Sequence, residues 1–572
     1  MKIALIQCNP LTGACADNVD MLARAVQKAA KRGADLCIAP QLVLCGPNAG
    51  DLLLREDFVR SCRHYLERLT EAISIEPGMP PLLLGAPVAN PVPRGKPLQN
   101  CAIVIQEGRL AVISRKCLLP GDNALNDVRY FEPGISCGVL QFKGWNFAVT
   151  IGEDAWNNST FWQKRRAFAT DPLADTMMAS QADAIINLAA LPYAQGGMEM
   201  QERVLRWLAV HYRVPVLTTN IVGGYDSLVY AGGATAFDAG GNILARSPLF
   251  HEDVLIVDIV EAIKNRTNPA SEKVSASPSA TQFEEGASPP SIEHELWQAM
   301  VLGTRDFARK SGFSKAVVGL SGGIDSTLVA AVATDAFGPN NVTGIMMPSP
   351  YSSTGSVDDS AKLARNLGIA TVTLPILPVM DGFRSIMSGT FEHGLRGLTE
   401  ENIQARIRGA LLMAFANEYR SVVLNTGNKS EAACGYCTLY GDLVGALCVI
   451  GDLYKHQVYA LCRWFNAMRG PLIPQEIFDK PPSAELAPNQ KDSDSLPPYD
   501  ILDAILSLLF EGGKGVQEIV DAGHEQHTVL KVLDLVSKAQ FKRQQAPTTL
   551  QLSPASFTRV WNMPIACNPQ MS

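Results

Sequence analysis

Val318-Gly319-Leu320-Ser321-Gly322-Gly323-Ile324-Asp325-Ser326 is the stretch that decides the fold of the second half of this chain. It joins an apolar run, residues 316–320, to a helix-forming run, residues 327–332. The apolar run predicts a buried parallel strand, and the small residues after it predict a tight turn. Such a turn presents backbone N–H groups and a helix N-terminus to an anion. Its glycines allow close approach of the backbone, and its serines add hydroxyl donors.

Asp325 is the unexpected member of this loop, because a carboxylate beside phosphates makes sense when a cation lies between them. The loop has no lysine, so it does not follow the Walker pattern G-x-x-x-x-G-K-S/T. An ordinary glycine-rich turn between a strand and a helix is the alternative that needs no ligand. We expect a phosphate-binding loop in which Asp325 is a metal ligand.

The segment 321–326 resembles the pyrophosphate loop of the ATP pyrophosphatases, which cleave ATP to AMP and pyrophosphate. That superfamily includes NAD, GMP, asparagine and argininosuccinate synthetases and several tRNA-modifying enzymes, so the loop alone does not choose among them. Further stretches across residues 292–545 resemble NAD synthetases only. These are residues 347–353, 399–409, 426–431, 440–442, 480–486, 494–500 and 541–544.

The resemblance implies an amidation that passes through an acyl-adenylate. A carboxylate is a poor electrophile and needs a leaving group before ammonia can attack it. In this family deamido-NAD attacks the α-phosphorus of ATP, pyrophosphate leaves, and ammonia then displaces AMP. Because charge builds on the phosphates, positioning and cations are expected to do most of the catalysis.

The resemblance also assigns roles to individual residues of the second half. The catalytic residues would be Asp325, Ser321 and Lys455. Mg²⁺ would be bound by Asp325 and Glu431, which offer hard oxygen ligands. The residues expected to contact ATP are Gly319, Ser321, Gly322, Gly323, Asp325, Ser326, Thr426, Lys455 and Ser483. Those expected near deamido-NAD are Asn402, Arg406, Glu431 and Lys542.

Three other patterns look like chemistry but are expected to be structural. Cys434 and Cys437 form a C-x-x-C without a second pair. The histidines of residues 524–527 are three apart rather than the four of H-E-x-x-H. Residues 512–515, Gly-Gly-Lys-Gly, lack the spacing of a Walker loop.

The first half alternates short apolar strands with helical stretches, which predicts a large α/β layer protein. Strands are expected at residues 2–7, 34–39, 81–86, 146–151, 184–188, 214–219, 234–238 and 254–259, with a hairpin around 106–109 and a helix over 18–30. Residues 1–260 resemble the nitrilase/amidase fold that supplies ammonia from glutamine in two-domain NAD synthetases. The landmarks are residues 39–40, 51–55, 115–116, 129–134 and 152–156.

The glutaminase of that family works with a Glu-Lys-Cys triad, and only the lysine, Lys116, is present here. Gln41 stands where the family has the general base, and Gly152 stands where it has the nucleophile. Pro47 and Gly50 stand where a tyrosine and a glutamate are usual. Removing a nucleophile typically costs several orders of magnitude in rate. We therefore expect a glutaminase pocket that no longer hydrolyses glutamine, and an enzyme that uses free ammonia.

Two alternatives stay open at this point. The first is a glutamine-dependent enzyme with an unorthodox nucleophile, for which Cys45 is a candidate: it lies four residues after Gln41 but lacks a paired base. The second is a non-catalytic nucleotide-binding subunit that partners a competent homologue. The intact loop and Glu431 argue against the second, because such a subunit has no need for Mg²⁺ ligands.

The length of 572 residues predicts two or more domains. We expect an α/β chain with a nitrilase-like αββα domain over residues 1–264 and a doubly wound parallel-sheet ATP-pyrophosphatase domain over 292–572. Residues 265–291, rich in Ser, Pro, Ala and Glu, are expected to be a linker.

The composition and charge of the chain limit the kinds of binding partner that we expect. A formal charge of −7 argues against nucleic acid, and no uncharged apolar stretch approaches the roughly 18 residues of a membrane span. The first apolar run is interrupted within residues 7–10 and is too short for a signal sequence. Thirteen cysteines without framework spacing suit a reducing cytoplasm. The resemblance implies a homo-oligomer, a dimer at least with an octamer as one option, in which the first domain serves as scaffold, regulator or receiver of ammonia.

Overall fold

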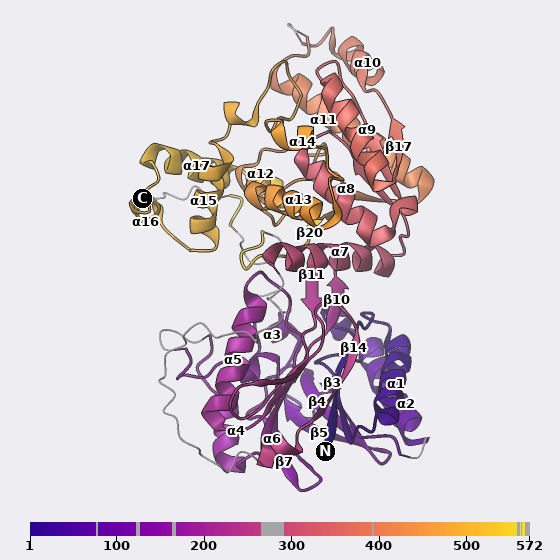
Figure 1. Cartoon of the computed structure of the whole chain (residues 1–572), viewed down its shortest axis with the longest axis vertical. Helices are drawn as coiled ribbons and strands as arrows, with labels where there is room; N and C mark the ends of the chain where they lie inside the picture. Colours follow the sequence, from indigo (N-terminus) through magenta and orange to yellow (C-terminus); the bar gives the residue numbers. More distant parts are fainter. Residues whose placement is uncertain are drawn as a thin grey trace. The chain divides into compact units, whose positions relative to one another are not determined.

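The computed structural model describes residues 1–75, 78–121, 126–162, 167–264, 291–391, 394–557, 561 and 563–566. The chain forms two compact units, Met1–Tyr225 with Val229–Pro289, and Asp226–Leu228 with Pro290–Ser572. Both are drawn in Figure 1, coloured along the sequence. The linker expected at 265–291 lies outside the described residues, apart from Ser291. Among the described residues, no helix combines the length and the apolar character that crossing a membrane requires.

Two six-stranded sheets form the first unit. One has the order β14-β1-β2-β3-β4-β5, and the other has the order β13-β12-β9-β8-β7-β6. The first sheet consists of β1 (Lys2–Gln7), β2 (Leu36–Ile38), β3 (Leu82–Ala89), β4 (Leu98–Gln106), β5 (Arg109–Arg115) and β14 (Asp253–Asp258). The second consists of β6 (Gly138–Phe142), β7 (Trp145–Ile151), β8 (Ala184–Leu188), β9 (Val216–Thr219), β12 (Thr235–Phe237) and β13 (Ile243–Arg246). A separate two-stranded ribbon pairs β10 (Val222–Tyr225) with β11 (Leu228–Ala231).

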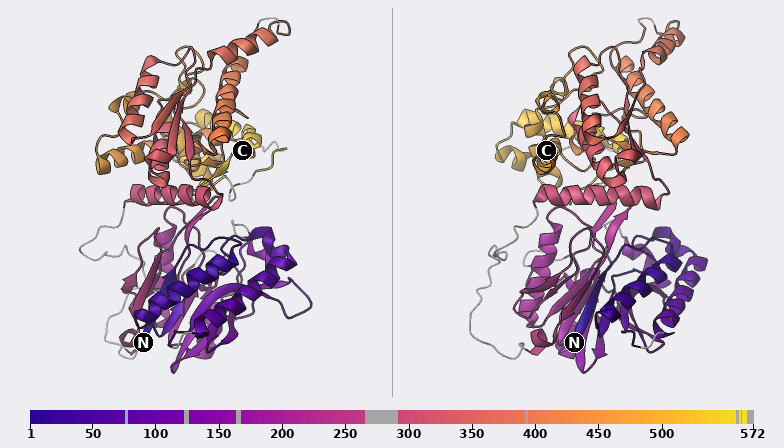
Figure 2. Two further views of the ribbon diagram at one scale, coloured as in Figure 1. Left: turned by 90° about the vertical axis from the view of Figure 1, so that its right-hand side faces the viewer. Right: turned by 45° about the vertical axis from the view of Figure 1, so that its right-hand side comes forward.

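Helices cover the outer face of each sheet of the first unit (Figures 1 and 2). Apolar residues of α1 (Cys15–Lys31) and α2 (Glu56–Ile75) pack on the first sheet, and those of α4 (Pro172–Ser180) and α5 (Gly197–Tyr212) pack on the second. The inner faces of both sheets share one core that includes Leu5, Ile38, Val149, Ile186 and Leu217. The predicted αββα layers are therefore confirmed. Shorter elements are η1 (Gly50–Leu54), α3 (Asp127–Tyr130), η2 (Gly152–Ala155) and α6 (Val260–Lys264).

The second unit is built on one six-stranded sheet in the order β17-β16-β15-β18-β19-β20, in which every recorded pair is parallel. Its strands are β15 (Ala316–Gly319), β16 (Val342–Met346), β17 (Ala370–Thr373), β18 (Val422–Asn425), β19 (Leu447–Cys448) and β20 (Thr548–Thr549). The chain runs outward from β15 to β16 and β17 on one side, and then to β18 on the other. This reversal of strand order confirms the doubly wound fold and makes the carboxyl end of β15 a topological switch point.

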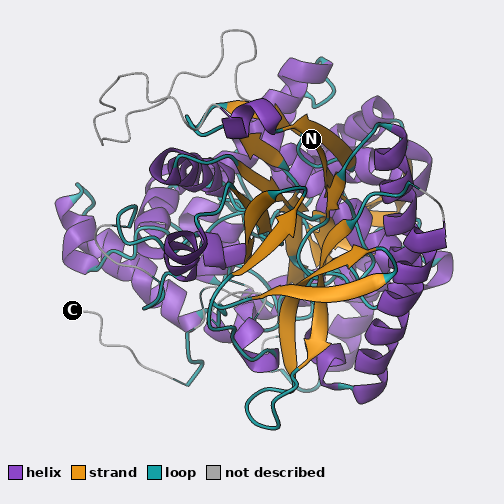
Figure 3. Ribbon diagram, turned by 90° about the horizontal axis from the view of Figure 1, so that it is seen from below, coloured by secondary structure: helices purple, strands orange, loops and turns teal. Residues whose placement is uncertain are grey.

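Helices of the second unit pack on this sheet, and Figure 1 shows a further group, α12 and α15 to α17, toward the C-terminus. Figure 3 colours the helices, strands and loops of the described residues separately. Leu412 of α11 packs on Val317 of β15 and Val423 of β18, and α8 packs against α7 and α13. A second apolar core joins α12 to α15, α16 and α17. The bounds are α7 (Ile292–Lys310), α8 (Ile324–Phe337), η4 (Pro339–Asn341), α9 (Thr354–Leu367), α10 (Leu377–Met387), α11 (Leu398–Tyr419), α12 (Lys429–Cys434), α13 (Lys455–Arg469), α14 (Gln475–Asp479), η5 (Asp492–Asp494), α15 (Tyr499–Phe510), α16 (Val516–Asp521), α17 (Gln526–Lys538) and α18 (Gln540–Arg543).

Most strands were predicted from their apolar runs, including the edge strand β17, expected at 371–374. β1 and β8 have the predicted bounds, and the expected hairpin joins β4 to β5 through Glu107 and Gly108, both at positive φ. Six short strands were missed, namely β6, β10, β11, β13, β19 and β20. These strands are two to five residues long and lie at or next to a sheet edge. Their pairing depends on partners distant in sequence more than on local pattern.

Candidate active site

The loop after β15 has the conformation that its glycines allow. Leu320 N donates to Ile345 O of β16 at 2.9 Å, and α8 begins at Ile324 directly after the turn. Gly322 has φ +78°, and a Cβ atom at this position would lie 2.5 Å from the carbonyl oxygen of Ser356. Only glycine fits between the loop and the start of α9.

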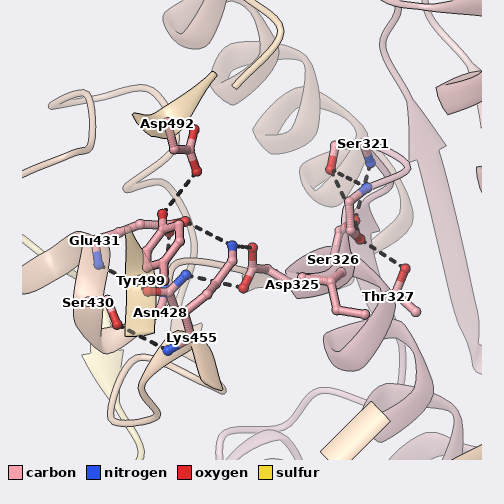
Figure 4. Close-up of polar contacts among 12 residues, drawn as sticks. Ser321, Asp325, Ser326, Thr327, Asn428, Ser430, Glu431, Lys455, Asp492 and Tyr499 are labelled. Atoms are coloured by element: carbon pink, nitrogen blue, oxygen red, sulfur yellow. Dashed lines mark hydrogen bonds and ion pairs between the residues drawn. The ribbon is translucent and has the colours of Figure 1, made fainter. Parts of the chain in front are cut away.

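The two serines of the loop hold its shape (Figure 4). The hydroxyls of Ser321 and Ser326 lie 3.1 Å apart. Ser326 Oγ also donates to Gly323 O at 3.0 Å, and Gly323 N donates to Ser321 Oγ at 3.3 Å. These bonds fix the turn that leads into the N-terminus of α8, and a helix N-terminus favours a bound anion.

Asp325, in the first turn of α8, meets side chains from two other helices (Figure 4). The ammonium of Lys455 forms a close ion pair with Asp325 Oδ2 and lies 3.5 Å from Glu431 Oε1. Asn428 Nδ2 donates to Asp325 Oδ1 at 3.1 Å. The ammonium therefore lies between two carboxylates whose positions are more than a hundred residues apart in sequence.

The N-terminal ends of α12 and α13 position Asn428, Glu431 and Lys455. α12 begins with a capping box, in which Asn428 Oδ1 accepts from Glu431 N at 3.0 Å and Glu431 Oε2 accepts from Asn428 N at 3.3 Å. α13 begins at Lys455, whose backbone N–H donates to Ser430 Oγ at 3.0 Å. α8, α12 and α13 thus direct their N-termini to the same site.

The site contains more acidic than basic side chains, with Asp325, Glu431 and Asp492 around Lys455. Burial raises the pKa of Glu431 to about 8, with Lys455 opposing this shift and Asp325 and Asp492 adding to it. Burial lowers the pKa of Lys455, whereas the carboxylates of Asp325 and Glu431 raise it. The carboxylates have the larger effect, so the pKa lies above its ordinary value. Burial also raises the pKa of Asp492. Three carboxylates surround one ammonium, an arrangement that a further cation would stabilise.

Asp492 has an oxygen to spare for such a cation. Its Oδ2 accepts from the Tyr499 hydroxyl at 2.9 Å, and the ring of Tyr499 lies 5.2 Å from the Lys455 ammonium. Its Oδ1 is buried and has no hydrogen-bond partner among the described residues. A hard cation bound to oxygen ligands would fit this set of donors.

A cavity of about 290 Å³ opens over the loop. Arg408, Lys480, Glu485 and Asp492 line it, although they were not assigned to the site from the sequence. The predicted residues that line it are Gly319, Ser321, Gly323, Asp325, Ser326, Thr426, Glu431, Lys455 and Ser483. Gly322 lies in the same loop against the Ser356 backbone and is not among the residues that line the cavity.

The three remaining residues expected near deamido-NAD do not line this cavity. They surround the segment that follows α12 instead. Asn402 Oδ1 accepts from Thr438 Oγ1 at 2.8 Å, and Arg406 Nε donates to Leu439 O at 3.2 Å. Lys542 Nζ donates to the carbonyls of residues 435 and 437, each at 2.7 Å. The structure brings Asn402, Arg406 and Lys542 to one segment, and their role toward a substrate stays a prediction.

Two cations in the cavity were missed from the sequence. Arg408 is fixed by a 3.1 Å hydrogen bond from Nε to Met347 O, and burial lowers its pKa to about 10 although Glu485 opposes the shift. Lys480 pairs with Glu485 at 2.7 Å. The signal was available, because both residues lie within stretches that resemble NAD synthetases. Arg408 and Lys480 add cationic groups to a cavity that also contains several carboxylates, and guanidinium and ammonium groups are suited to contact phosphate oxygens.

A second constellation lies in the first unit, where Gln41, Lys116 and Gly152 come together. Gly152 follows β7 directly and has φ +53°. A Cβ atom at this position would lie 2.7 Å from Gln41 Oε1 and 3.3 Å from Lys116 Nζ. The Gln41 amide therefore occupies the space that a side chain at position 152 would need.

Lys116 and Gln41 differ in whether their buried polar atoms have partners. The Lys116 ammonium is fully buried and pairs with Asp127 at 2.7 Å and with Glu153 at 2.6 Å. Burial lowers its pKa, but these two carboxylates outweigh that effect and hold the pKa above its ordinary value. Both amide atoms of Gln41 are buried without a hydrogen-bond partner among the described residues. Lys116 thus stays charged and is held in place by its two ion pairs. Gln41 cannot act as a base, and its amide has no hydrogen-bond partner among the described residues.

Cys45 is buried in an apolar cluster with Leu42, Cys62 and Phe131. Its thiol donates weakly to the Leu42 and Gly46 carbonyls at 3.6 and 3.5 Å. In the described part of the chain, neither the Cys434–Cys437 pair nor the histidines at 524 and 527 belong to a group of three potential metal ligands.

Comparisons with known proteins extend over both units. Residues 2–265 match the carbon-nitrogen hydrolase family, and residues 296–546 match the NAD synthase family. The chain is 43% identical over 571 residues to the glutamine-dependent NAD(+) synthetase of Synechocystis sp. and 38% identical over 586 residues to that of Thermotoga maritima, each covering 99% of this chain and 98% of the relative. It is also similar to the solved structure of glutamine-dependent NAD+ synthetase from Acinetobacter baumannii in complex with ADP, with a TM-score of 0.74, 31% identity, and coverage of 99% of this chain and 98% of that one.

Proposed function

The chain belongs to the NAD+ synthetase family in its two-domain form, and we propose that it amidates deamido-NAD with ATP and free ammonia rather than with glutamine. The relatives named above are called glutamine-dependent, so this proposal separates the present chain from them. The single observation that carries it is the pocket of the first unit. At position 152 a glycine offers no nucleophile, and the Gln41 amide fills the adjoining space.

In the synthetase half, the phosphates of ATP would bind the loop 321–326 and the N-terminus of α8. Arg408 and Lys480 would neutralise charge on the phosphates within the cavity. The deamido-NAD carboxylate would attack the α-phosphorus, the bond to the β-phosphate bridging oxygen would break, and pyrophosphate would leave. Ammonia would then attack the acyl-adenylate carbonyl, and AMP would depart.

Asp325 and Glu431 would hold Mg²⁺, with Asp492 as a further oxygen donor. When bound, the ion supplies positive charge that stabilises the departing pyrophosphate. Asn428 would keep Asp325 oriented through its 3.1 Å hydrogen bond. Lys455, between the carboxylates, would exchange one of them for a phosphate oxygen once the nucleotide binds.

Nitrogen use provides the test. Purified protein is supplied with deamido-NAD, ATP and Mg²⁺, and with either ammonium chloride or ammonia-free glutamine, and NAD+ and glutamate are both quantified. We expect NAD+ with ammonium, and neither NAD+ above the ammonia background nor glutamate with glutamine. Glutamate released in step with NAD+ would contradict the proposal.

The same assay distinguishes the alternatives. If glutamate is released and Cys45→Ala abolishes the release, the enzyme has an unorthodox nucleophile. If saturating ammonium supports no NAD+ formation by a well-folded chain, the synthetase site is inactive and the chain is a binding subunit. The first outcome would contradict the proposed use of free ammonia, and the second would contradict the proposed synthetase activity.

A further inference from the structure

We propose that Cys117, Cys137 and Asp154 bind a thiophilic divalent cation, for which Zn²⁺ is the natural probe. The three residues come from three segments of the first unit, after β5, before β6 and within η2. Their ligand atoms, two thiol sulfurs and one carboxylate oxygen, all lie within 4.8 Å of one another. Among the described residues this is the one group of three such side chains that converge so closely.

The site is largely buried, but a metal ion can reach it from solvent at Cys117. Cys137 and Asp154 are buried, whereas Cys117 is half-buried. The sulfurs of Cys137 and Cys117 lie within 4.8 Å of each other. Cys117 Sγ also donates to a backbone carbonyl, Arg115 O, at 3.3 Å. Two sulfurs are thus already side by side, and a cation could reach them from the half-exposed side of Cys117.

Asp154 has one acceptor position left and forms no ion pair among the described residues, although the nearby Lys116 ammonium lowers its pKa in opposition to burial. Its Oδ1 accepts from Cys117 N at 3.0 Å and from Leu118 N at 2.8 Å, and its Oδ2 accepts from Cys117 N at 3.2 Å. A carboxylate offers about four lone-pair sites, so one site on Oδ2 remains free. No cationic side chain of the described residues lies within ion-pair distance of Asp154, because Lys116 pairs with Asp127 and Glu153. A bound cation would offset the cost of burying this charge.

The donor set fits zinc better than magnesium or calcium. Two thiolates and one carboxylate are ligands of Zn²⁺, which prefers four-coordinate tetrahedral sites, whereas Mg²⁺ and Ca²⁺ select oxygen ligands. Water on the half-exposed side of Cys117 can complete the coordination. A pair of thiols that merely pack together is the alternative, and Cys15 with Cys62, 3.7 Å apart, is an example in the same unit. That pair lacks a carboxylate ligand.

The position gives the site a structural role. Cys117 follows Lys116 directly, and Asp154 lies two residues after Gly152. β5 is the edge strand of one sheet and β6 that of the other. A metal ion here would join the two sheets beside the former glutaminase pocket, and it would stabilise the backbone that carries Lys116 and Gly152.

Zinc binding by the full-length, reduced and chelator-treated protein is the decisive experiment. We expect one equivalent of Zn²⁺ to bind in competition with a chromophoric chelator, and the midpoint of thermal unfolding to rise with it. Co²⁺ should give a thiolate-to-metal charge-transfer absorption. Cys137→Ser and Cys117→Ser should each weaken Zn²⁺ binding by at least about tenfold, as loss of a ligand or its support typically does.

Cys62→Ser is the matched control, because it removes one member of the other close thiol pair in the same unit. It should bind Zn²⁺ like the wild type. If Cys137→Ser fails to fold, Cys117→Ser decides the matter, because its side chain is half-exposed. The proposal is overturned if the reduced wild type binds no Zn²⁺, if both site variants bind it unchanged, or if Cys62→Ser loses it. It is also overturned if peptide mapping finds Cys117 and Cys137 joined in a disulfide and the reduced chain still takes up no metal.

Discussion

Gly152 and Gln41 have to be considered as a pair. The glycine removes the nucleophile, and the neighbouring amide oxygen lies where a Cβ atom would be, at 2.7 Å. Restoring a cysteine at position 152 would therefore displace Gln41 as well as add a thiol. Pro47 and Gly50 depart from the family pattern close by in the sequence, so the proposed loss of glutaminase activity involves several positions.

We predict that Gly152→Ala destabilises the chain through contact with Gln41. The cost should be about 1–3 kcal/mol, because the added methyl meets a buried amide at a positive-φ position. Gly144→Ala is the matched control: Gly144 also has positive φ, +81°, but a Cβ atom there meets nothing within 4 Å. Thermal unfolding midpoints of the two variants should therefore differ, and Gly152→Ala should be the lower. Equal midpoints would show that the Gln41 side chain yields without cost.

Lys116→Ala should leave ammonia-driven NAD+ formation within about threefold, which is less than ~1 kcal/mol of activation free energy. No oxyanion is expected near Lys116, since position 152 has no thiolate. The same variant should unfold at lower temperature, because Asp127 and Glu153 would be left without their buried partner. The two readouts separate a structural lysine from a catalytic one. A loss of turnover well beyond threefold at a temperature where the variant is folded would refute the structural role.

Asp325→Ala should abolish NAD+ formation from ammonium, with a loss of at least about 100-fold. The residue contacts Lys455 and Asn428 and is an expected Mg²⁺ ligand, so its removal disturbs three parts of the site. Circular dichroism should show an intact fold. Asp358→Ala is the control, because Asp358 is an exposed carboxylate outside the cavity. Wild-type turnover by folded Asp325→Ala would remove Asp325 from the mechanism.

At the scale of elements, three helix N-termini support the proposal that the site binds the phosphates of ATP. α8, α12 and α13 all begin beside the loop after β15, and each contributes positive partial charge there. Lys455 at the first position of α13 adds a full positive charge to a helix end that already favours anions. The nearby carboxylates of Asp325 and Glu431 compensate for it.

Asn428→Ala should affect turnover more than stability. The variant loses the capping bond to Glu431, which costs about 1 kcal/mol, and also the hydrogen bond that orients Asp325. Ser291→Ala removes the corresponding cap of α7, where Ser291 Oγ accepts from His294 N at 3.3 Å away from the site. Both variants should lose similar stability, but only Asn428→Ala should lower kcat with ammonium. Equal turnover in the two variants would mean that Asn428 serves α12 alone.

On the scale of the whole molecule, the two units pose different questions. The second unit contains the whole cavity with its loop, carboxylates and cations. The first unit retains the buried Lys116 with its ion pairs and an αββα core, but it lacks the glutamate and the cysteine of the triad. Its proposed role is therefore assembly or regulation.

Removal of about residues 1–265 should change assembly more than chemistry. The truncated chain is expected to keep ammonia-driven NAD+ formation while its oligomer, measured by light scattering, becomes smaller. The reason is that every residue proposed to act on ATP lies after position 318. An unchanged oligomer would exclude the scaffold role, and a folded but inactive truncated chain would show that the first unit supports the reaction.

The sequence by itself determined the chemistry that depends on residue identity. The glycines and serines of residues 319–326 predicted an anion-binding turn, because few residue types allow that backbone. Gly152 and Gln41 predicted the loss of a nucleophile and a base, since neither residue can supply one. Periodicity also predicted the buried strands of both units, because their apolar runs are local features.

The tertiary structure decided what depends on distances between remote residues. It placed Arg408, Lys480 and Asp492 in the cavity. It also showed the Gln41 amide in the space beside Gly152 and brought Cys117 and Cys137 to Asp154. The partner of a charged group or a thiol depends on which strand ends and helix N-termini come together in the fold. Contacts between residues tens to hundreds of positions apart leave no periodic pattern in the sequence.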